Sequence, residues 1–317
     1  MKVEDVKRIA CLGTGTMGYG ITFLHALHGY HVRMFGRSEA SVERGMKQIR
    51  RAVRLYIRKG LLEADKADGL MARIAGVTTL KEAVTGADFV MEAVAEDLDV
   101  KHAILSEVED CVKEDCVIAS TTSGLSPTAL AECLKRPRNF IVAHYWNPPH
   151  LVPLVEIVPG KKTAKETIDF TWAITEKVGK KPVALKREAL GFIGNRLQLA
   201  LLREALYIVE EGIAAPEAVD RAIKYGIGRR LGVTGPLESA DLGGLDIFCG
   251  VAGYLNQDLC NGKEPSRLLE GLVAEGKLGA KTGAGFYEWS PERLEAVQER
   301  RESILIDFLN KDKEITF

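Results

Sequence analysis

The sequence has 317 residues, 46% of them hydrophobic and 27% charged, with a formal net charge of −1 at pH 7. A chain of this length can bury a large core and is expected to divide into two domains. A net charge near zero argues against a nucleic-acid or membrane-surface binder, and no apolar run reaches the roughly 18 residues of a membrane span. The first apolar run begins at Ile9, and the six cysteines form no CxxC motif. We therefore expect no cleaved targeting segment, no metal site and a cytoplasmic protein with reduced thiols.

A glycine-rich turn follows that first apolar run. Residues 9–12 have the pattern of a short buried strand and lead directly into the sequence GTGTMG at 13–18. A helical stretch and a second strand pattern at 31–35 come next, which is the order of a dinucleotide-binding unit. In such units the first glycine permits the tight turn, the second admits a pyrophosphate, and the third allows the helix to pack closely. We predict that the cofactor-binding residues of this turn are Gly13, Gly15, Thr16, Met17 and Gly18.

The end of the second strand pattern bears on the choice of cofactor. About 20 residues after the turn, an acidic residue normally binds the adenosine ribose hydroxyls of NAD. This chain has Gly36-Arg37-Ser38 at that point. No carboxylate there repels a 2′-phosphate, and Arg37 and Ser38 offer it a positive charge and a hydroxyl. The triplet favours NADP over NAD and places Gly36, Arg37 and Ser38 at the cofactor; an exposed loop beside NAD is the open alternative.

Short apolar runs continue to alternate with longer helical stretches as far as about residue 185. They lie at 74–77, 89–93, 117–120, 140–144, 154–158 and 182–185. This alternation predicts an α/β fold: a Rossmann-like, doubly wound, mostly parallel sheet over residues 1–187, with a helical insertion at about 38–72. From Gly191 onward only helical periodicity is left, with glycines and prolines between the segments. We expect an all-helical C-terminal domain over residues 188–317.

The insertion carries two different faces at helical spacing. One face is apolar, and another is basic. The basic face either is an ordinary solvated surface or holds the phosphates of a large acyl carrier. The apolar residues are Val42, Met46, Ile49, Val53 and Tyr56, and the basic ones are Lys47, Arg51, Arg54 and Arg58.

A histidine and a glutamate twelve residues apart are the candidate chemical centre. His144 ends a strand pattern, and Glu156 lies inside the apolar run 153–158. Burying a carboxylate alone is costly, so Glu156 needs a partner, and His144 is the candidate. An alcohol-oxidising enzyme needs such a pair, in which the imidazole removes the hydroxyl proton and the carboxylate orients the ring. The alternative is that the pair has a purely structural role. The predicted dinucleotide-binding unit at residues 9–35 favours the catalytic role.

Further motifs follow in a fixed order along nearly the whole chain. They are Ser120-Thr121-Thr122-Ser123-Gly124-Leu125, His144-Tyr145-Trp146-Asn147-Pro148, Leu154-Val155-Glu156, Gly191-Phe192-Ile193-Gly194-Asn195-Arg196, Gly235-Pro236-Leu237-Glu238 and the segment 279–287. Together they resemble the L-3-hydroxyacyl-CoA dehydrogenase family. The resemblance implies hydride transfer between the C3 hydroxyl carbon of a 3-hydroxyacyl-CoA and a nicotinamide cofactor, for which NAD is the family default, in a homodimer formed through the helical domain.

The resemblance also implies roles for individual residues. His144 corresponds to the catalytic base and Glu156 to its acidic partner. Ser123 and Asn195 correspond to the residues that hydrogen-bond the substrate oxygen, although a helix cap or an interhelical bond is the structural alternative for each. Two further sets follow from the resemblance: Asn147 helps to hold the base and the substrate carbonyl, and Glu96 and Lys101 line the nicotinamide ribose.

Departures from the family pattern leave the substrate open. Thr121 replaces a usual asparagine, Gly124 a second serine and Gly36 the ribose-binding aspartate. The segment 226–236 is longer than in the acyl-CoA enzymes and is similar to relatives that oxidise free hydroxy acids, such as carnitine and gulonate dehydrogenases. The Asn-Pro-Pro-His sequence at 147–150 is similar to a pyridine-carboxylate branch. Arg230 is accordingly either a fork for a substrate carboxylate or a surface charge.

Three functional hypotheses remain from the sequence. The first is an NAD(P)-dependent 3-hydroxyacyl-CoA dehydrogenase, and the second is the same chemistry on a small free 3-hydroxy acid. The third is a dinucleotide-binding protein without catalysis, against which the presence of His144, Glu156, Ser123 and Asn195 together argues.

Overall fold

The computed structural model describes residues 2–314, which form two compact units. The first unit comprises residues up to Asn195 together with those from Arg301 onward, and the second comprises Arg196–Arg300. The sequence predicted a domain boundary after residue 187. In the structure, residues 188–195 and the last helix from Arg301 onward belong to the first unit, which contains the sheet. None of the helices in the described part of the chain is both long and apolar enough to cross a membrane.

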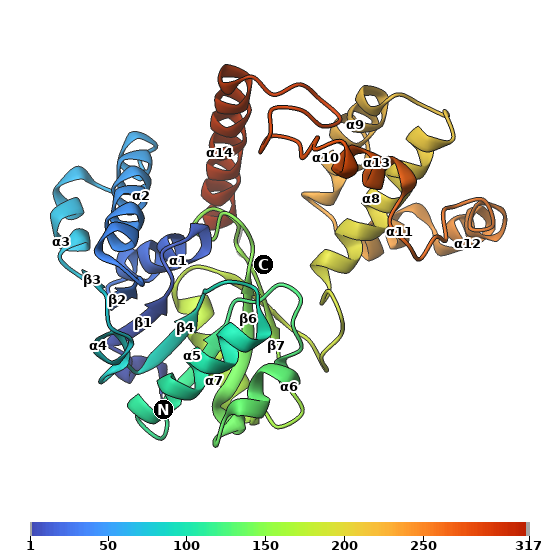
Figure 1. Ribbon diagram of the computed structural model, residues 1–317. Helices are drawn as coiled ribbons and strands as arrows, with labels where there is room; N and C mark the ends of the chain where they lie inside the picture. Colours follow the sequence, from blue (N-terminus) through green and yellow to red (C-terminus); the bar gives the residue numbers. More distant parts are fainter. Residues whose placement is uncertain (1, 315–317) are drawn as a thin grey trace. The chain divides into compact units, whose positions relative to one another are not determined.

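The first unit is built on a mixed, mostly parallel sheet (Figure 1). Its strand order within the described residues is β3-β2-β1-β4-β5-β6-β7-β8, and every neighbouring pair is parallel except β6 and β7. The predicted doubly wound sheet is therefore confirmed, strand by strand, to within about a residue. The bounds are β1 Arg8–Leu12, β2 His31–Phe35, β3 Ile74–Val77, β4 Phe89–Glu92, β5 Val117–Ser120, β6 Phe140–Tyr145, β7 Leu154–Val158 and β8 Lys181–Ala184.

Helices cover both faces of this sheet, because successive strand residues point alternately to opposite sides. One core cluster joins Cys11 and Met34 of the strands to the helices α1, α2 and α7, and to Ile306 near the chain end. The other joins Leu12 and Val90 to α4, α5 and α6. The bounds are α1 Thr16–Leu27, α2 Glu39–Arg58, α3 Ala67–Met71, α4 Leu80–Val84, α5 Leu98–Cys111, α6 Pro127–Leu130 and α7 Lys165–Lys177, with short 3₁₀ turns at Val3–Asp5, Ala64–Lys66, Ala131–Cys133 and Pro137–Asn139.

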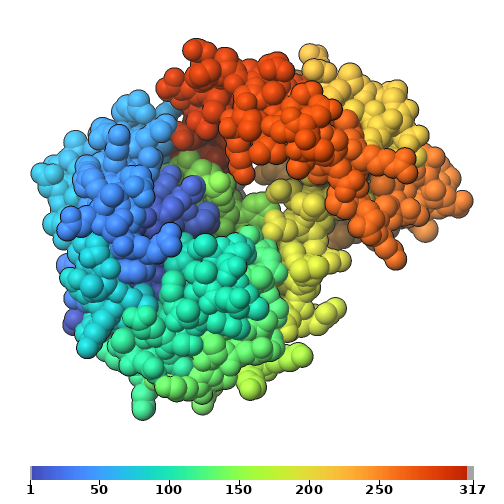
Figure 2. Space-filling model, in the orientation of Figure 1, coloured from blue at the N-terminus to red at the C-terminus, as the bar shows by residue number. Residues whose placement is uncertain are grey.

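The segment of the predicted helical insertion contains α2 and the short α3, and α2 has one apolar and one basic face. Ile49, Val53 and Tyr56 are buried against the first core cluster. The four basic residues at 47, 51, 54 and 58 are exposed. In the space-filling view α2, in light blue, lies at the surface of the unit (Figure 2).

The second unit is helical, and few of its apolar side chains are buried. Among residues 196–300, Leu206 is the one apolar side chain that is fully buried within the described structure. Large apolar side chains on α11 and α12 are exposed instead, including Leu242 (79%) and Leu245 (61%). The bounds are α8 Gly194–Glu210, α9 Pro216–Tyr225, α10 Ile227–Leu231, α11 Pro236–Gly243, α12 Leu245–Leu255, α13 Arg267–Ala274 and α14 Pro291–Glu314, the first and last of which extend across the unit boundary.

Candidate active site

The glycine-rich turn connects β1 to α1, and each glycine in it has a structural reason. Gly13 has φ +130°, and a Cβ there would lie 2.4 Å from the carbonyl oxygen of Ala93. A Cβ on Gly18 would lie 2.1 Å from the oxygen of Gly13, so only glycine lets α1 pack this close. Gly15 is the N-cap of α1, and a Cβ there would meet nothing within 4 Å. The N-terminus of α1 is thus open at Gly15, which suits the approach of a pyrophosphate.

The chain after β2 turns directly into α2, and side chains lie close to position 36. A Cβ on Gly36 would lie 2.5 Å from Ser41 Oγ and 2.8 Å from Thr14 Cγ2, so a larger residue would have to displace these side chains. Ser38 is the N-cap of α2, since its hydroxyl oxygen accepts a hydrogen bond from the Ser41 N–H at 3.2 Å. Arg37 between them is exposed. Whether these residues bind a 2′-phosphate stays a prediction.

The antiparallel pairing of β6 and β7 brings His144 and Glu156 together. In this register the two residues are direct cross-strand partners, so their side chains lie on the same face. His144 Nδ1 and Glu156 Oε2 are 2.8 Å apart, and both side chains are buried, at 7% and 0% exposed. A carboxylate can only accept, so Nδ1 carries the proton and Nε2 is left as the basic nitrogen.

Four donors converge on the Glu156 carboxylate. Oε2 accepts from His144 and from Trp146 Nε1 at 3.1 Å, and Oε1 accepts from the backbone N–H groups of Ile193 at 2.8 Å and Gly194 at 3.0 Å. Burial by itself would raise the pKa of Glu156, but the hydrogen bonds from His144, Gly194, Ile193 and Trp146 together lower its pKa below the ordinary value. Glu156 is therefore an ionised, fully hydrogen-bonded carboxylate.

A sharp backbone turn before α8 supplies two of these donors. Gly191 and Phe192 both have positive φ, 73° and 53°, and Phe192 is the one non-glycine residue with this conformation among those described. A buried, non-glycine residue in this region is strained unless its surroundings hold it. Phe192 is held by packing, since it is buried and its ring centroid lies 5.4 Å from that of His144. The turn thereby points the Ile193 and Gly194 N–H groups at Glu156.

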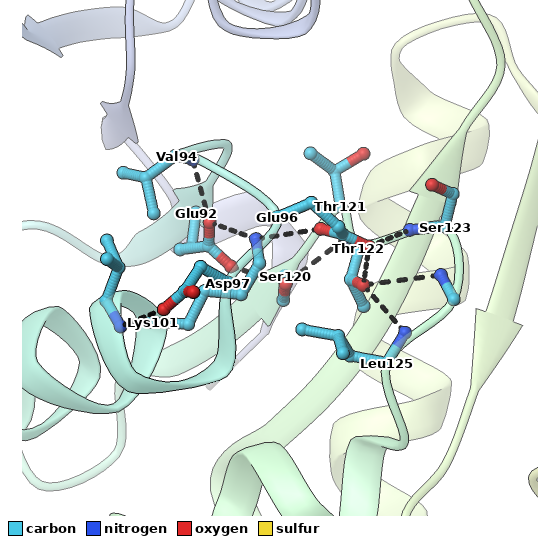
Figure 3. A network of polar contacts seen from close by, with 12 residues as sticks. Glu92, Val94, Glu96, Asp97, Lys101, Ser120, Thr121, Thr122, Ser123 and Leu125 are labelled. Atoms are coloured by element: carbon cyan, nitrogen blue, oxygen red, sulfur yellow. Dashed lines mark hydrogen bonds and ion pairs between the residues drawn. The ribbon is translucent and has the colours of Figure 1, made fainter. Parts of the chain in front are cut away.

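A second carboxylate network lies where β4 and β5 end, at the same edge of the sheet (Figure 3). Glu92 is fully buried and accepts from Lys101 Nζ at 2.7 Å and from the backbone N–H of Val94 at 2.7 Å, and it also binds the Ser120 hydroxyl. Lys101, 1% exposed, also lies 3.3 Å from Glu96 Oε2. The network fixes the segments that follow both strands.

Glu96 holds the loop that presents Ser123. Its Oε1 accepts from the Thr122 hydroxyl and from the Ser123 backbone N–H at 3.1 Å (Figure 3). Burial would raise the pKa of Glu96, but Thr122, Lys101 and Ser123 together lower its pKa. Lys101 is enclosed between carboxylates, whereas the Glu96 side chain is 45% exposed. Contact of either with a nicotinamide ribose stays a prediction.

The remaining expected site residues are placed as follows. Asn195, the second residue of α8, donates its side-chain amide to the Ser123 backbone oxygen at 3.0 Å, so these two lie together in the first unit. Asn147 is exposed in the loop after β6. Arg54 is exposed on α2, and Arg230 is exposed on α10 in the second unit.

Sequence reasoning missed three contributors to these networks. Glu92, like Glu156, is a carboxylate within an apolar run, but no role was predicted for it from the sequence. Trp146 and Phe192 lie within the quoted motifs, but their contacts with Glu156 and His144 depend on how distant segments pack together, which no spacing predicts.

Two protein-family models match successive parts of the chain. Residues 8–189 match the 3-hydroxyacyl-CoA dehydrogenase NAD binding domain, and residues 191–289 match the C-terminal domain of the same enzymes. The chain belongs to the 3-hydroxyacyl-CoA dehydrogenase family. It is an oxidoreductase of that family, and its first unit is of the kind that binds a nicotinamide cofactor, which the open N-terminus of α1 at Gly15 suits.

Relatives in the family differ in what their names say they act on. The chain is 33% identical over 307 residues to 5-formyl-3-hydroxy-2-methylpyridine 4-carboxylate 5-dehydrogenase of Mesorhizobium japonicum, covering 95% of this chain and 96% of the relative. It is 35% identical over 286 residues to a probable 3-hydroxybutyryl-CoA dehydrogenase of Bacillus subtilis, covering 90% and 98%. A crystal structure described as the pyridine-carboxylate dehydrogenase, an NAD⁺-dependent dismutase, matches with a TM-score of 0.89 at 32% identity, over 95% of this chain and 97% of that one.

Proposed function

We propose that the protein is a nicotinamide-dependent dehydrogenase that oxidises the C3 hydroxyl of a 3-hydroxyacyl-CoA, with His144 as the general base. The observation that carries this proposal is the buried His144–Glu156 pair, which leaves Nε2 of the ring as a proton acceptor. An ionised carboxylate that fixes the ring tautomer is the arrangement that a histidine general base requires.

Each residue of the site then has a defined task. His144 Nε2 takes the hydroxyl proton, and Glu156 stabilises the imidazolium that forms. Ser123 and Asn195, joined by their 3.0 Å hydrogen bond, position the substrate oxygen. The nicotinamide supplies hydride chemistry when bound. In the reverse direction, the imidazolium of His144 returns its proton to the alkoxide.

A small free 3-hydroxy acid is the second candidate substrate. It is favoured by the likeness to the pyridine-carboxylate dehydrogenase over nearly the whole length of both chains. In this case Arg230 would bind the substrate carboxylate. In the acyl-CoA case the exposed basic residues of α2 would bind the phosphates of CoA. The ion pair within the described residues of that helix, Arg50 with Glu43, uses none of Lys47, Arg51, Arg54 and Arg58.

We also propose a homodimer and a preference for NADP. The exposed apolar side chains of the second unit suit a second copy of the chain as their cover. The preference rests on Gly36-Arg37-Ser38, while the relative described as NAD⁺-dependent supports the alternative.

One experiment tests the central assignment. NADPH and NADH are titrated into the protein, and turnover is measured with acetoacetyl-CoA, free acetoacetate and a panel of other free 3-oxo acids. His144→Gln should lower kcat by about 10²–10⁴-fold and leave nucleotide binding nearly intact. His31→Gln, at an exposed histidine of β2, is the control. Turnover by His144→Gln at the level of the unaltered protein would show that His144 is not the base.

A further inference from the structure

Two hydrogen-bond donors share one oxygen of Glu156. His144 Nδ1 lies 2.8 Å from Oε2, and the indole Nε1 of Trp146 lies 3.1 Å from the same atom. The other oxygen is occupied by the two backbone N–H groups that precede and begin α8. The carboxylate that orients the base is therefore shared with a neutral donor two residues further along the chain.

The indole is held in this place by its packing. A Cβ on Gly194 would lie 2.2 Å from Trp146 Cζ2, so a residue larger than glycine would displace the ring. The centroids of the Trp146 and His144 rings are 5.7 Å apart at an interplanar angle of 55°. Trp146 is partly buried. The contacts with Gly194 and His144 therefore restrict the orientation in which its N–H reaches Oε2.

This arrangement has a consequence for the base. Each hydrogen bond to a carboxylate oxygen partly neutralises the negative charge on that oxygen. A neighbouring imidazolium is stabilised by the charge that remains. An indole N–H on Oε2 therefore weakens the stabilisation of protonated His144. The side chains in hydrogen-bond or ring contact with His144 among the described residues are Glu156, Trp146 and Phe192, so Glu156 is the titratable group that faces it.

We infer that Trp146 is a positioning residue: by donating its indole N–H to Glu156 Oε2, it keeps His144 unprotonated to lower pH than the His–Glu pair alone would. This inference rests on the proposed function, because it concerns the same base. It concerns the proton affinity of His144, and the assignment of His144 as the base does not depend on it.

The test needs no knowledge of the substrate. The protein is labelled with ¹³C at the histidine Cε1 positions, and the six histidines are titrated by NMR; the resonance lost in His144→Gln identifies His144. In Trp146→Phe the midpoint of the His144 titration should rise by about half a pH unit or more, because the competing donor is gone. Trp146→3-benzothienylalanine, which replaces the N–H by sulfur and keeps the ring shape, should give the same rise.

Trp172→Phe in α7 is the matched control. Its ring packs against the first core cluster, and no described hydrogen bond involves its indole, so the midpoint should not move. With acetoacetyl-CoA or the active free 3-oxo acid, the acid limb of kcat/KM should shift upward by the same amount as the titration.

The outcomes separate this inference from the proposed function. A His144 midpoint that is unchanged or lower in both Trp146 variants would overturn the inference, even if His144→Gln is inactive. If His144→Gln is fully active, the base assignment fails, whatever the midpoint does. A loss of kcat in the two variants with an unchanged pH dependence would reduce Trp146 to a packing role.

Discussion

The two units of this chain bury their apolar side chains to very different extents. In the first, side chains such as Phe23, Leu105 and Phe140 are fully enclosed on the two faces of the sheet. In the second, one apolar side chain is fully buried among residues 196–300, while Leu242 and Leu245 are mostly exposed. A unit that hides its core can be stable by itself, whereas a helical unit with this much exposed apolar surface needs another surface to cover it.

The first expected effect concerns that exposed surface. The double variant Leu242→Glu/Leu245→Glu places two charges where we propose a second copy to pack, and burying unpaired charges is costly. We expect the dissociation constant of the homodimer to rise by about a hundredfold or more, measured by analytical ultracentrifugation. Core substitutions of the first unit, such as Leu105→Ala, should cost about 2–5 kcal/mol of unfolding free energy without changing the dissociation constant.

The control for this surface is Asn261→Glu, which adds a charge at an exposed polar position of the same unit. It should leave the dimer intact. The comparison between the units would be broken if the unaltered protein stayed monomeric at every concentration, or if the double variant dimerised normally.

The next effect is a pH dependence that belongs to the first unit. Burial lowers the pKa of His25 to about 4, and burial with the nearby Lys180 lowers that of His150 to about 4. Between the ordinary value of 6.5 and about 4, the unfolded chain therefore binds more protons than the folded one. Stability should fall as the pH drops through this window, by roughly 3 kcal/mol for each of the two histidines. Urea unfolding at a series of pH values measures this slope.

A pair of substitutions checks the assignment of the slope. His25→Phe keeps an aromatic ring beside Tyr30 and Phe89 and should flatten the dependence between pH 6.5 and 4 by about half. His31→Gln changes an exposed histidine and should leave the slope as it is. An unchanged slope in His25→Phe would contradict the burial argument.

Much of the first unit could be predicted from the sequence, because its strands are determined by short stretches of neighbouring residues. Each strand is a short apolar run between turn residues, so burial on both faces left a clear signal, and the pair of His144 and Glu156 followed from the cost of burying a carboxylate. The donors Ile193 and Gly194 could not be predicted, because they depend on the strained turn at Phe192. The Trp146 donor could not be predicted either, because its ring packs against Gly194, which is distant in the sequence.

The second unit could be predicted only as helical. Periodicity reports which face of a helix is apolar, but it does not report what covers that face. The exposure of Leu242 and Leu245 therefore became visible only in the fold.

A smaller expected effect, on KM, tests which of the two units binds the substrate. Lys47→Gln/Arg54→Gln removes two charges from α2 in the first unit and should raise KM for acetoacetyl-CoA by about three- to tenfold, since each exposed ion pair contributes up to about 1 kcal/mol. A free 3-oxo acid should be unaffected. Arg230→Ala in the second unit should show the reverse pattern if the substrate is a free acid.

Arg50→Gln is the control for α2, because Arg50 is already paired with Glu43. It should change neither KM. If neither Lys47→Gln/Arg54→Gln nor Arg230→Ala changes any KM, both regions are ordinary surface and the substrate is bound elsewhere.

The last expected effect is on the choice of cofactor, and it should belong to the first unit alone. Gly36→Asp is not a usable test, because a Cβ at position 36 would lie 2.5 Å from Ser41 Oγ and would disturb the cap of α2. Arg37→Ala leaves that cap in place and removes the charge that we propose to pair with a 2′-phosphate. Steady-state kcat/KM with NADPH should fall by roughly tenfold, as expected for one charge-assisted hydrogen bond, and with NADH by less than about twofold. Leu242→Glu/Leu245→Glu should leave the ratio of the two cofactors unchanged, and a tenfold preference of the unaltered protein for NADH would refute the NADP assignment.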